Sequence, residues 1–321
     1  MKIPNLLEVA IENEIQGIKI TELKEIAQNL SNRYMNEKRL GQTLLSKQKE
    51  ALAYSIMRMP ATFCAVTTAL RHTLNIVENY KIETVLDIGA GTGAATWAIN
   101  ELINPKEITC LERETAMRDV GQALMRYNAE MQNTEWINED ITNSQLIKGA
   151  DLIISSYMIN ELKQEERKNV IKTLLQLESK IVLIIEPGTP EGFKNIKEIQ
   201  KIALESGAYI IAPCTNQQIC KLPENDWCHT TVRVERNKIH KLLKSGELPY
   251  EDEKFSYIAI SKENSGTAES RILRHPIIES GKITLKLCTN GNIEQKIITK
   301  KEKEQFKQAK KKKCGDFIII K

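Results

Sequence analysis

The order of apolar and polar residues divides the chain into three parts. From Leu6 to Tyr80 apolar residues recur at helical spacing, interrupted only at Pro60, so residues 1–80 are predicted to form a helical N-terminal segment. From Glu83 onward short apolar runs alternate with longer amphipathic ones, which is typical of a parallel β-sheet covered by helices. The predicted strands are 84–88, 107–111, 151–155 and 181–185, with 208–212 and 255–261 as the last two.

Residues 263–321 follow a different pattern. Two strand-like runs, 283–288 and 293–299, flank an Asn-Gly pair, which is a strong hairpin signal. A small β-rich C-terminal tail is therefore expected. Residues 81–262 then form the Rossmann-like domain, and residues 213–253, between its last two strands, are a cysteine-rich insertion.

A glycine-rich turn follows the first predicted strand. Gly89, Gly91 and Gly93 alternate after Asp87. Glycines let the backbone turn tightly and approach a ligand, and the next helix offers unpaired N–H groups. A dinucleotide fingerprint would space its glycines G-x-G-x-x-G. The D-x-G-x-G-x-G form found here resembles motif I of class I methyltransferases, which bind S-adenosylmethionine.

Two acidic residues lie at the positions where that resemblance implies acids. In class I methyltransferases the next strand ends in an acid that holds the ribose hydroxyls, and Glu112 ends the run 108–112. The strand after that supplies an acid near the adenine, where Asp140 stands. The resemblance implies an α/β class I S-adenosylmethionine methyltransferase fold, although a purely structural glycine turn is the alternative. The implied cofactor-binding residues are Asp87, Gly89, Gly91, Gly93, Glu112 and Asp140.

Three cysteines, Cys214, Cys220 and Cys228, fall within fifteen residues of polar sequence. Zinc sites usually place two to four residues between paired cysteines, and these spacings are wider, so zinc is the less favoured metal. Cubane iron–sulfur clusters are held by four thiolates, and either Cys288 or Cys314 could supply the fourth. Unligated cysteines on a polar loop are the remaining alternative.

The net charge of +4 is unevenly distributed. Residues 296–313 hold nine lysines against only Glu302 and Glu304, which indicates either a solvated helix face or a phosphate-binding patch. A second basic segment, 233–244, is predicted to be a surface helix with apolar residues on one face. The expected apolar face consists of Ile239, Leu242 and Leu243.

The chain has no apolar stretch of the roughly 18 residues that a membrane span needs, so no membrane partner is expected. Its first residues lack the basic-then-apolar order of a signal peptide. A cytoplasmic protein with reduced or metal-bound thiols is therefore expected. Cys64 and Cys110 lie in apolar runs and are predicted to be buried small hydrophobes.

Eight short stretches distributed over nearly the whole chain carry a more specific signal. They are Leu30–Tyr34, Arg58–Thr62, Ser156–Leu162, Glu186–Pro190, Ala212–Cys220, Asp226–His229, Arg233–Arg236 and Tyr250–Tyr257. Together they resemble the methyltransferase-like family associated with the small ribosomal subunit, whose mitochondrial members are ribosome assembly factors. The resemblance implies the small ribosomal subunit and its rRNA as partners. Neither DNA binding nor a stable oligomer is expected.

The same resemblance implies a 4Fe-4S cluster. Carried over position by position, its ligands are Cys214, Cys220 and Cys228 from the insertion and Cys288 from a later strand. Cys314 stands where the family commonly has a tryptophan before Gly-Asp, so it is a departure and is not expected to be a ligand.

The sequence leaves the chemistry open. Methyl transfer to a poor nucleophile needs a positioned acceptor and a base. Base-amine methyltransferases carry an Asn/Asp-Pro-Pro-aromatic motif after the fourth strand, where this chain has Ser155-Ser-Tyr-Met158. Asn160 and Glu161 are the best polar candidates, but a helix start explains them equally well. The catalytic residues therefore stay unassigned. Three functions remain: an rRNA methyltransferase, a non-catalytic assembly factor that keeps the fold as a scaffold, and a non-RNA methyltransferase with structural zinc.

Overall fold

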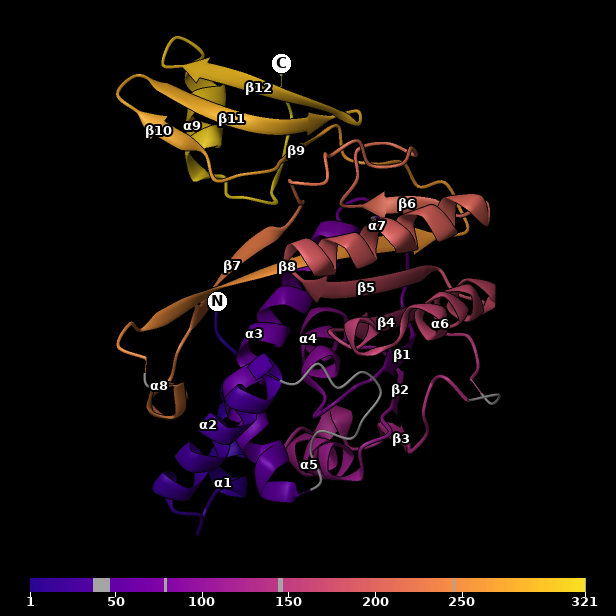
Figure 1. Ribbon diagram of the computed structural model, residues 1–321, viewed down its shortest axis with the longest axis vertical. Coiled ribbons are helices and arrows are strands. Elements are labelled where there is room, and N and C mark those ends of the chain that lie inside the picture. Colours follow the sequence, from indigo (N-terminus) through magenta and orange to yellow (C-terminus); the bar gives the residue numbers. More distant parts are fainter. Residues whose placement is uncertain (37–46, 78–79, 144–146, 245, 321) are drawn as a thin grey trace.

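The computed structural model describes residues 1–36, 47–77, 80–143, 147–244 and 246–320. Its centre is a mixed sheet of eight described strands in the order β3-β2-β1-β4-β5-β8-β6, with β7 paired only to β8 (Figure 1). The strands are β1 Thr84–Ile88, β2 Glu107–Leu111, β3 Glu135–Ile137, β4 Leu152–Ser156, β5 Ile181–Pro187, β6 Tyr209–Ala212, β7 Thr230–Glu235 and β8 Tyr250–Ser261.

Strands β1 to β5 run parallel, while β8 runs antiparallel to both β5 and β6. Almost every residue of β1, β4 and β5 is buried, because helices cover both faces of the sheet. The α/β Rossmann-like fold is thus confirmed. The covering helices are α3 Gln48–Leu74, α4 Ala94–Ile103 and α5 Thr115–Met125 on one face, and α6 Gln164–Gln176 and α7 Pro190–Glu205 on the other.

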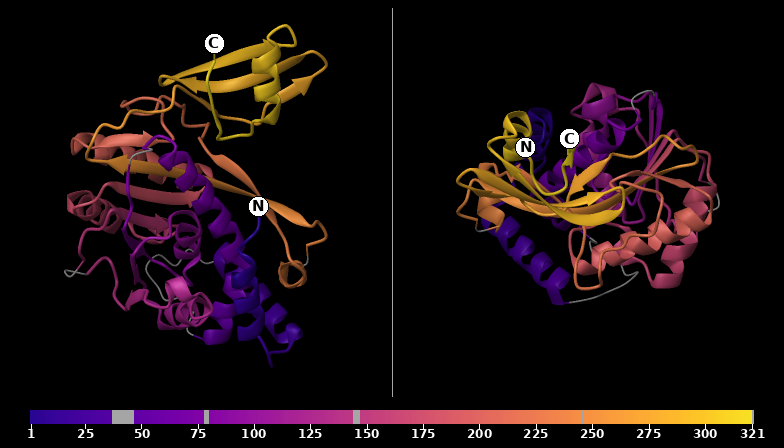
Figure 2. Two further views of the ribbon diagram at one scale, coloured as in Figure 1. Left: turned by 180° about the vertical axis from the view of Figure 1, so that it is seen from behind. Right: turned by 90° about the horizontal axis from the view of Figure 1, so that it is seen from above.

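The described N-terminal part is mainly helical, as predicted. Helices α1 (Asn5–Glu14) and α2 (Ile20–Asn36) pack beside α3 at the end of the molecule away from the C-terminus (Figures 1 and 2). The expected interruption at Pro60 is wrong, because α3 continues through this buried proline. The part of the prediction that covers 37–46 and 78–79 lies outside the described residues. None of the described helices is both long and apolar enough to cross a bilayer.

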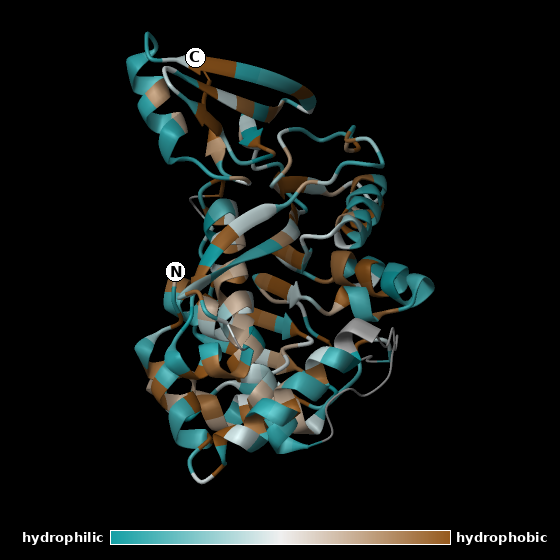
Figure 3. Ribbon diagram, turned by 60° about the vertical axis from the view of Figure 1, so that its left-hand side comes forward, coloured by the Kyte–Doolittle hydropathy of each residue, from teal (hydrophilic) through white to brown (hydrophobic). Residues whose placement is uncertain are grey.

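The C-terminal residues build a second sheet at the far end of the molecule (Figure 1). The predicted hairpin is confirmed: β11 and β12 turn at Asn290 and Gly291, whose φ angles of +47° and +80° suit a two-residue turn. One face buries apolar side chains under α9, while the outer side of α9 is hydrophilic (Figure 3). The elements are β9 Ser270–Ile272, β10 Ile277–Glu279, β11 Lys282–Thr289, β12 Asn292–Thr299, α9 Lys303–Lys311 and β13 Phe317–Ile318.

The predicted basic helix over 233–244 is wrong in its first part. Residues up to Glu235 belong to β7, because the alternating Thr-Thr-Val-Arg-Val run finds a pairing partner in β8, and helix α8 is only Lys238–Lys244. Within α8, Leu243 is buried and Ile239 packs against the core, as expected, but Leu242 is 45% exposed. The basic side chains pair with acids on β8: Arg233 with Asp252, and Arg236 and Lys244 with Glu251.

Candidate functional sites

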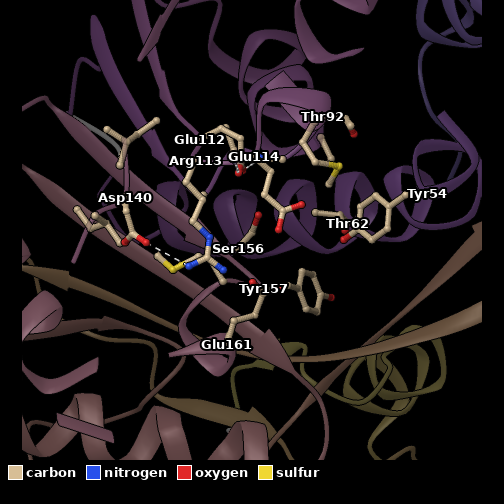
Figure 4. A pocket seen from close by; sticks show the side chains of 18 of the residues that line it. Tyr54, Thr62, Thr92, Glu112, Arg113, Glu114, Asp140, Ser156, Tyr157 and Glu161 are labelled. Carbon is tan, nitrogen blue, oxygen red and sulfur yellow. Dashed lines mark hydrogen bonds and ion pairs between the residues drawn. The ribbon is translucent and has the colours of Figure 1, made fainter. Parts of the chain in front are cut away.

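A cavity lies at the carboxyl ends of β1, β2 and β4, where ligands bind in open α/β sheets (Figure 4). Its walls come from α3, the loop after β1, the end of β2, the segment after β3 and the segment after β4. Among the residues that line it are Tyr54, Thr62, Gly89, Gly91, Glu112, Arg113, Glu114, Asp140, Tyr157 and Glu161.

The glycine loop is tied closely to its neighbours. The N–H groups of Gly89 and Ala90 donate to the Leu111 carbonyl at 2.9 and 3.1 Å, which anchors the loop to β2. Gly89 has φ +66°, and a Cβ there would lie 2.5 Å from Cγ of Met158. Gly91 also has a positive φ, +58°. Only glycine meets both demands at position 89, so the loop backbone can approach a ligand.

The Glu112 carboxylate stands beside this loop. It is 7% exposed and accepts hydrogen bonds from the N–H groups of Gly91 at 2.7 Å and Glu114 at 2.8 Å. Burial raises its pKa, while these two hydrogen bonds act in the opposite direction. Each carboxylate oxygen has further acceptor capacity, so the group is suited to hold vicinal hydroxyls in the cavity.

Asp140 closes another wall of the same cavity. Its carboxylate pairs with Arg113 at 3.2 Å and accepts hydrogen bonds from the N–H and hydroxyl of Thr142 at 2.9 and 2.7 Å. Burial pushes the pKa of Asp140 upward, but the bonds from Thr142 and Arg113 outweigh it and hold the pKa below its ordinary value. The group is therefore ionised at neutral pH.

Two of the six predicted cofactor residues do not line the cavity. Asp87 is fully buried at the end of β1, where it accepts a hydrogen bond from the Thr96 hydroxyl at 2.7 Å. Burial raises its pKa to about 7. Gly93 forms the N-cap of α4 with φ +84°. Both shape the strand–helix turn, whereas Gly89, Gly91, Glu112 and Asp140 face the cavity.

Several residues that line the cavity were not predicted from the sequence. Tyr54 and Thr62 enter the cavity from α3, a helix distant in sequence from the glycine loop. Tyr157 adopts φ +59°, and its hydroxyl donates to Glu253 at 2.9 Å. Arg58 pairs with the same carboxylate and lies over the Tyr157 ring at 5.7 Å. The sequence signal for this network was the resemblance in the stretches Arg58–Thr62, Ser156–Leu162 and Tyr250–Tyr257.

The two polar candidates after β4 are placed differently. Glu161 lines the cavity, and burial raises its pKa to about 7. Asn160 is not among the lining residues, and its N–H donates to the Glu186 carboxylate at 3.2 Å. Glu161 is thus the titratable side chain best placed to exchange a proton inside this cavity near neutral pH.

A second cavity lies between the insertion and the C-terminal sheet, and all four predicted ligands line it: Cys214, Cys220, Cys228 and Cys288. They come from the segment after β6, the insertion loop, the residues before β7 and the middle of the C-terminal hairpin. Cys314 does not line the cavity. It is fully buried and its thiol donates to the carbonyls of His229 and Leu273.

Gln200 on α7 connects two of these cysteines, a contact that no sequence motif predicted. Its amide N–H lies 3.3 Å from Sγ of Cys214, and its carbonyl accepts the Cys220 N–H at 3.0 Å. On the other side, the Thr215 hydroxyl lies 3.4 Å from Sγ of Cys288. Burial raises the pKa of Cys214 and Cys220, and that of Cys228 to about 11. Binding a metal at these thiols would therefore release protons.

Four thiol side chains around one cavity are the donor type that either a zinc ion or a cubane cluster needs. Within the described part of the chain, no three Cys, His, Asp or Glu side chains are grouped to hold one metal ion. Tetrahedral zinc needs four sulfurs that are each about 2.3 Å from one point. In a cubane cluster each thiolate binds its own iron, so the sulfurs stand farther apart. The cavity also contains the buried guanidinium of Arg271, which is chemically complementary to an anionic group.

Comparisons with known proteins indicate the family of the chain. A family model described as "Mitochondrial small ribosomal subunit Rsm22" matches residues 48–318. The human protein described as "Ribosome assembly protein METTL17, mitochondrial" is 20% identical over 291 residues, with 84% of this chain covered. The match spans 62% of the length of the human protein.

Among solved structures, the chain is similar to a plantazolicin methyltransferase in complex with S-adenosylhomocysteine, at 14% identity and a TM-score of 0.45. The match covers 79% of this chain and 99% of that one. It is also similar to the N-methyltransferase NodS from Bradyrhizobium japonicum, at 12% identity and a TM-score of 0.43, with 74% and 99% covered.

Proposed function

The chain belongs to the Rsm22 family of the mitochondrial small ribosomal subunit, and from this premise we propose that it binds S-adenosylmethionine and acts on the small ribosomal subunit. The proposed action is methylation of its rRNA, subunit assembly, or both. The protein is further proposed to hold a 4Fe-4S cluster. The cytoplasmic location stays a prediction.

The observation that carries the proposal is the cavity at the sheet edge, where the glycine loop and Glu112 converge. Gly89 and Gly91 would admit the cofactor, Glu112 would accept hydrogen bonds from its ribose hydroxyls, and Asp140 would lie near its adenine. The bound cofactor would supply an electrophilic methyl group. Glu161 could take the proton that an N–H acceptor loses, because its pKa lies near neutral pH.

The cysteine cavity supports a structural role for the cluster. Its four thiols belong to two regions that are already linked by hydrogen bonds, such as that from the Gly291 N–H to the Thr215 hydroxyl at 2.9 Å. Asp226 in the insertion pairs with both Arg274 and Lys286 of the C-terminal part. A cluster bound to the four cysteines would fix these regions together more strongly than the polar contacts alone.

Contact with rRNA is proposed for the C-terminal part. Residues 263–321 contain 14 Lys and Arg against 7 Asp and Glu, a net charge of +7, so the other residues together carry −3 of the total +4. The lysines of α9 and its flanks are mostly exposed, and none forms an ion pair within the described residues. Such a surface binds phosphates in a salt-dependent and largely sequence-independent manner. By contrast, three of the basic residues in and before α8, Arg233, Arg236 and Lys244, are paired with acids on β8.

Methyl transfer from labelled S-adenosylmethionine to small-subunit RNA and to immature subunits tests the proposal. Wild type should transfer label, and Gly91→Arg should abolish both transfer and cofactor binding. The matched control is Gly207→Arg, since Gly207 has a similar positive φ and nothing within 4 Å of its added Cβ. Cofactor binding and subunit binding without any transfer would instead indicate a non-catalytic assembly factor.

Metal analysis of anaerobically purified protein tests the cluster. About four iron and four acid-labile sulfide per chain are expected, with loss of both in Cys288→Ser and retention in Cys314→Ser. One zinc per chain without sulfide would contradict the cluster and favour a methyltransferase with structural zinc. For the RNA surface, removal of residues 300–313 should weaken subunit binding and reduce its salt dependence. Unchanged binding would disprove that role.

A further inference from the structure

Arg271 is a cation buried inside the cysteine cavity. It lies at the centre of β9, is 2% exposed, and lines the cavity together with the four cysteines. In the antiparallel pairing of β9 with β11, Arg271 is directly opposite Cys288. Directly opposed residues place their side chains on the same face of a sheet, with Cβ atoms about 5 Å apart. The strand register therefore places the Arg271 guanidinium and the Cys288 thiol on the same face of the C-terminal sheet.

The polar contacts of Arg271 leave much of its donor capacity unused. Its Nη2 donates to the Thr230 hydroxyl at 2.8 Å, and the guanidinium lies over the Tyr257 ring at 5.5 Å. Its Nε and Nη1 have no hydrogen-bond partner among the described residues. No carboxylate of the described chain forms an ion pair with it, in contrast to Arg58, Arg233 and Arg274.

A buried cation without a counter-ion is costly, and buried charges are normally paired or bound to an ionic group. The four cysteines of the cavity, as thiolates, are the negative groups that could balance the charge of Arg271. Four thiolates carry more negative charge than a cubane core carries positive charge, so the ligated cluster is an anion. Hydrogen bonds to the sulfur atoms and nearby charge are known to set the potential of such clusters.

We propose that Arg271 is a positioning residue of the cluster: its Nε and Nη1 donate to the cluster-ligating thiolates or cluster sulfides, and its charge balances theirs. This inference rests on the proposed cluster. Because the positive charge stabilises the state with the extra electron, Arg271 makes the cluster easier to reduce and slower to lose iron. Thr230 orients the guanidinium through Nη2.

The test uses the full-length protein purified without oxygen, as wild type, Arg271→Met and Arg271→Lys. Arg233→Met is the matched control, because it removes an exposed arginine of β7 that does not line the cavity. The measurements are iron and sulfide content, the rate of iron loss to a chelator, and the midpoint potential from a dye-mediated titration followed by electron paramagnetic resonance.

Arg271→Met should lower the midpoint potential and weaken iron retention by roughly 10- to 100-fold, as for other groups that support metal ligands. Arg271→Lys should restore most of the potential, since it keeps the charge, but only part of the iron retention, since it lacks the planar donors. Arg233→Met should behave like wild type. A wild-type potential and wild-type iron retention in Arg271→Met would overturn the inference.

Thermal unfolding of the iron-free proteins separates this role from a purely structural one. Without the cluster, Arg271→Met should melt at a higher temperature than wild type, because the unpaired buried charge is gone. With the cluster bound, the order should reverse. A variant that is less stable in both states would show that the bond to Thr230 is what matters, and the inference would be wrong. Absence of iron and sulfide from wild type itself would overturn the proposed cluster, and this inference with it.

Discussion

Alanine at Gly89 tests how closely the glycine loop after β1 is packed. The added Cβ would lie 2.5 Å from Cγ and 2.8 Å from Cβ of Met158, and this Cβ is attached to the backbone and cannot rotate away. A left-handed conformation costs a non-glycine residue roughly 1–2 kcal/mol, and overpacking typically adds about 1–3 kcal/mol. Alanine also lowers the conformational entropy of the unfolded chain, and this stabilises the folded state by about 0.4–1 kcal/mol. The expected net loss in the free energy of unfolding is about 2–4 kcal/mol.

Gly207→Ala is the control, because Gly207 has φ +76° but nothing within 4 Å of an added Cβ. Gly207→Ala has the cost of the left-handed backbone without overpacking, so its free energy of unfolding should fall by about 1 kcal/mol. Urea unfolding followed by circular dichroism gives both values, and calorimetric titration gives S-adenosylmethionine affinity, which only Gly89→Ala should reduce. Met158→Ala should recover part of the loss in the double variant. Equal losses at the two glycines would refute the close packing of the loop.

Three further outcomes are expected. Glu112→Gln should weaken S-adenosylmethionine binding by about 10- to 100-fold in calorimetry, because charge-assisted hydrogen bonds contribute roughly 1.5–3 kcal/mol; unchanged affinity would exclude Glu112 from the cofactor site. Asp226→Asn should destabilise the protein by about 1–3 kcal/mol and speed hydrogen exchange in β11, since both of its cationic partners lose their counter-charge; exchange rates like those of wild type would contradict this link. Burial raises the pKa of Glu186 to about 8, so the folded state binds an extra proton, and stability should fall by up to about 1.4 kcal/mol per pH unit between its ordinary pKa and pH 8. Glu186→Gln should flatten that decline in urea unfolding measured across pH, and an unchanged profile would assign the decline to other groups.

Local sequence determined the parts of this protein that depend on neighbouring residues. The short apolar runs predicted the strands, because a strand buried on both faces needs no alternation. Asn290 and Gly291 predicted the hairpin, because a two-residue turn requires positive φ at both positions. The alternating glycines and the acid Glu112 predicted one wall of the cavity at the sheet edge, since strand ends in a parallel sheet meet at one edge.

Tertiary structure decided which distant residues meet. Residues 233–235 have a pattern compatible with a helix, yet they form a strand because β8 offers them a paired edge and acidic partners. Tyr54 reaches the cavity at the sheet edge only because α3 packs across the sheet. Arg271 faces Cys288 because of the register between β9 and β11. Backbone preferences are encoded over a few residues, whereas strand order, register and buried charge are fixed by the packing of the whole chain.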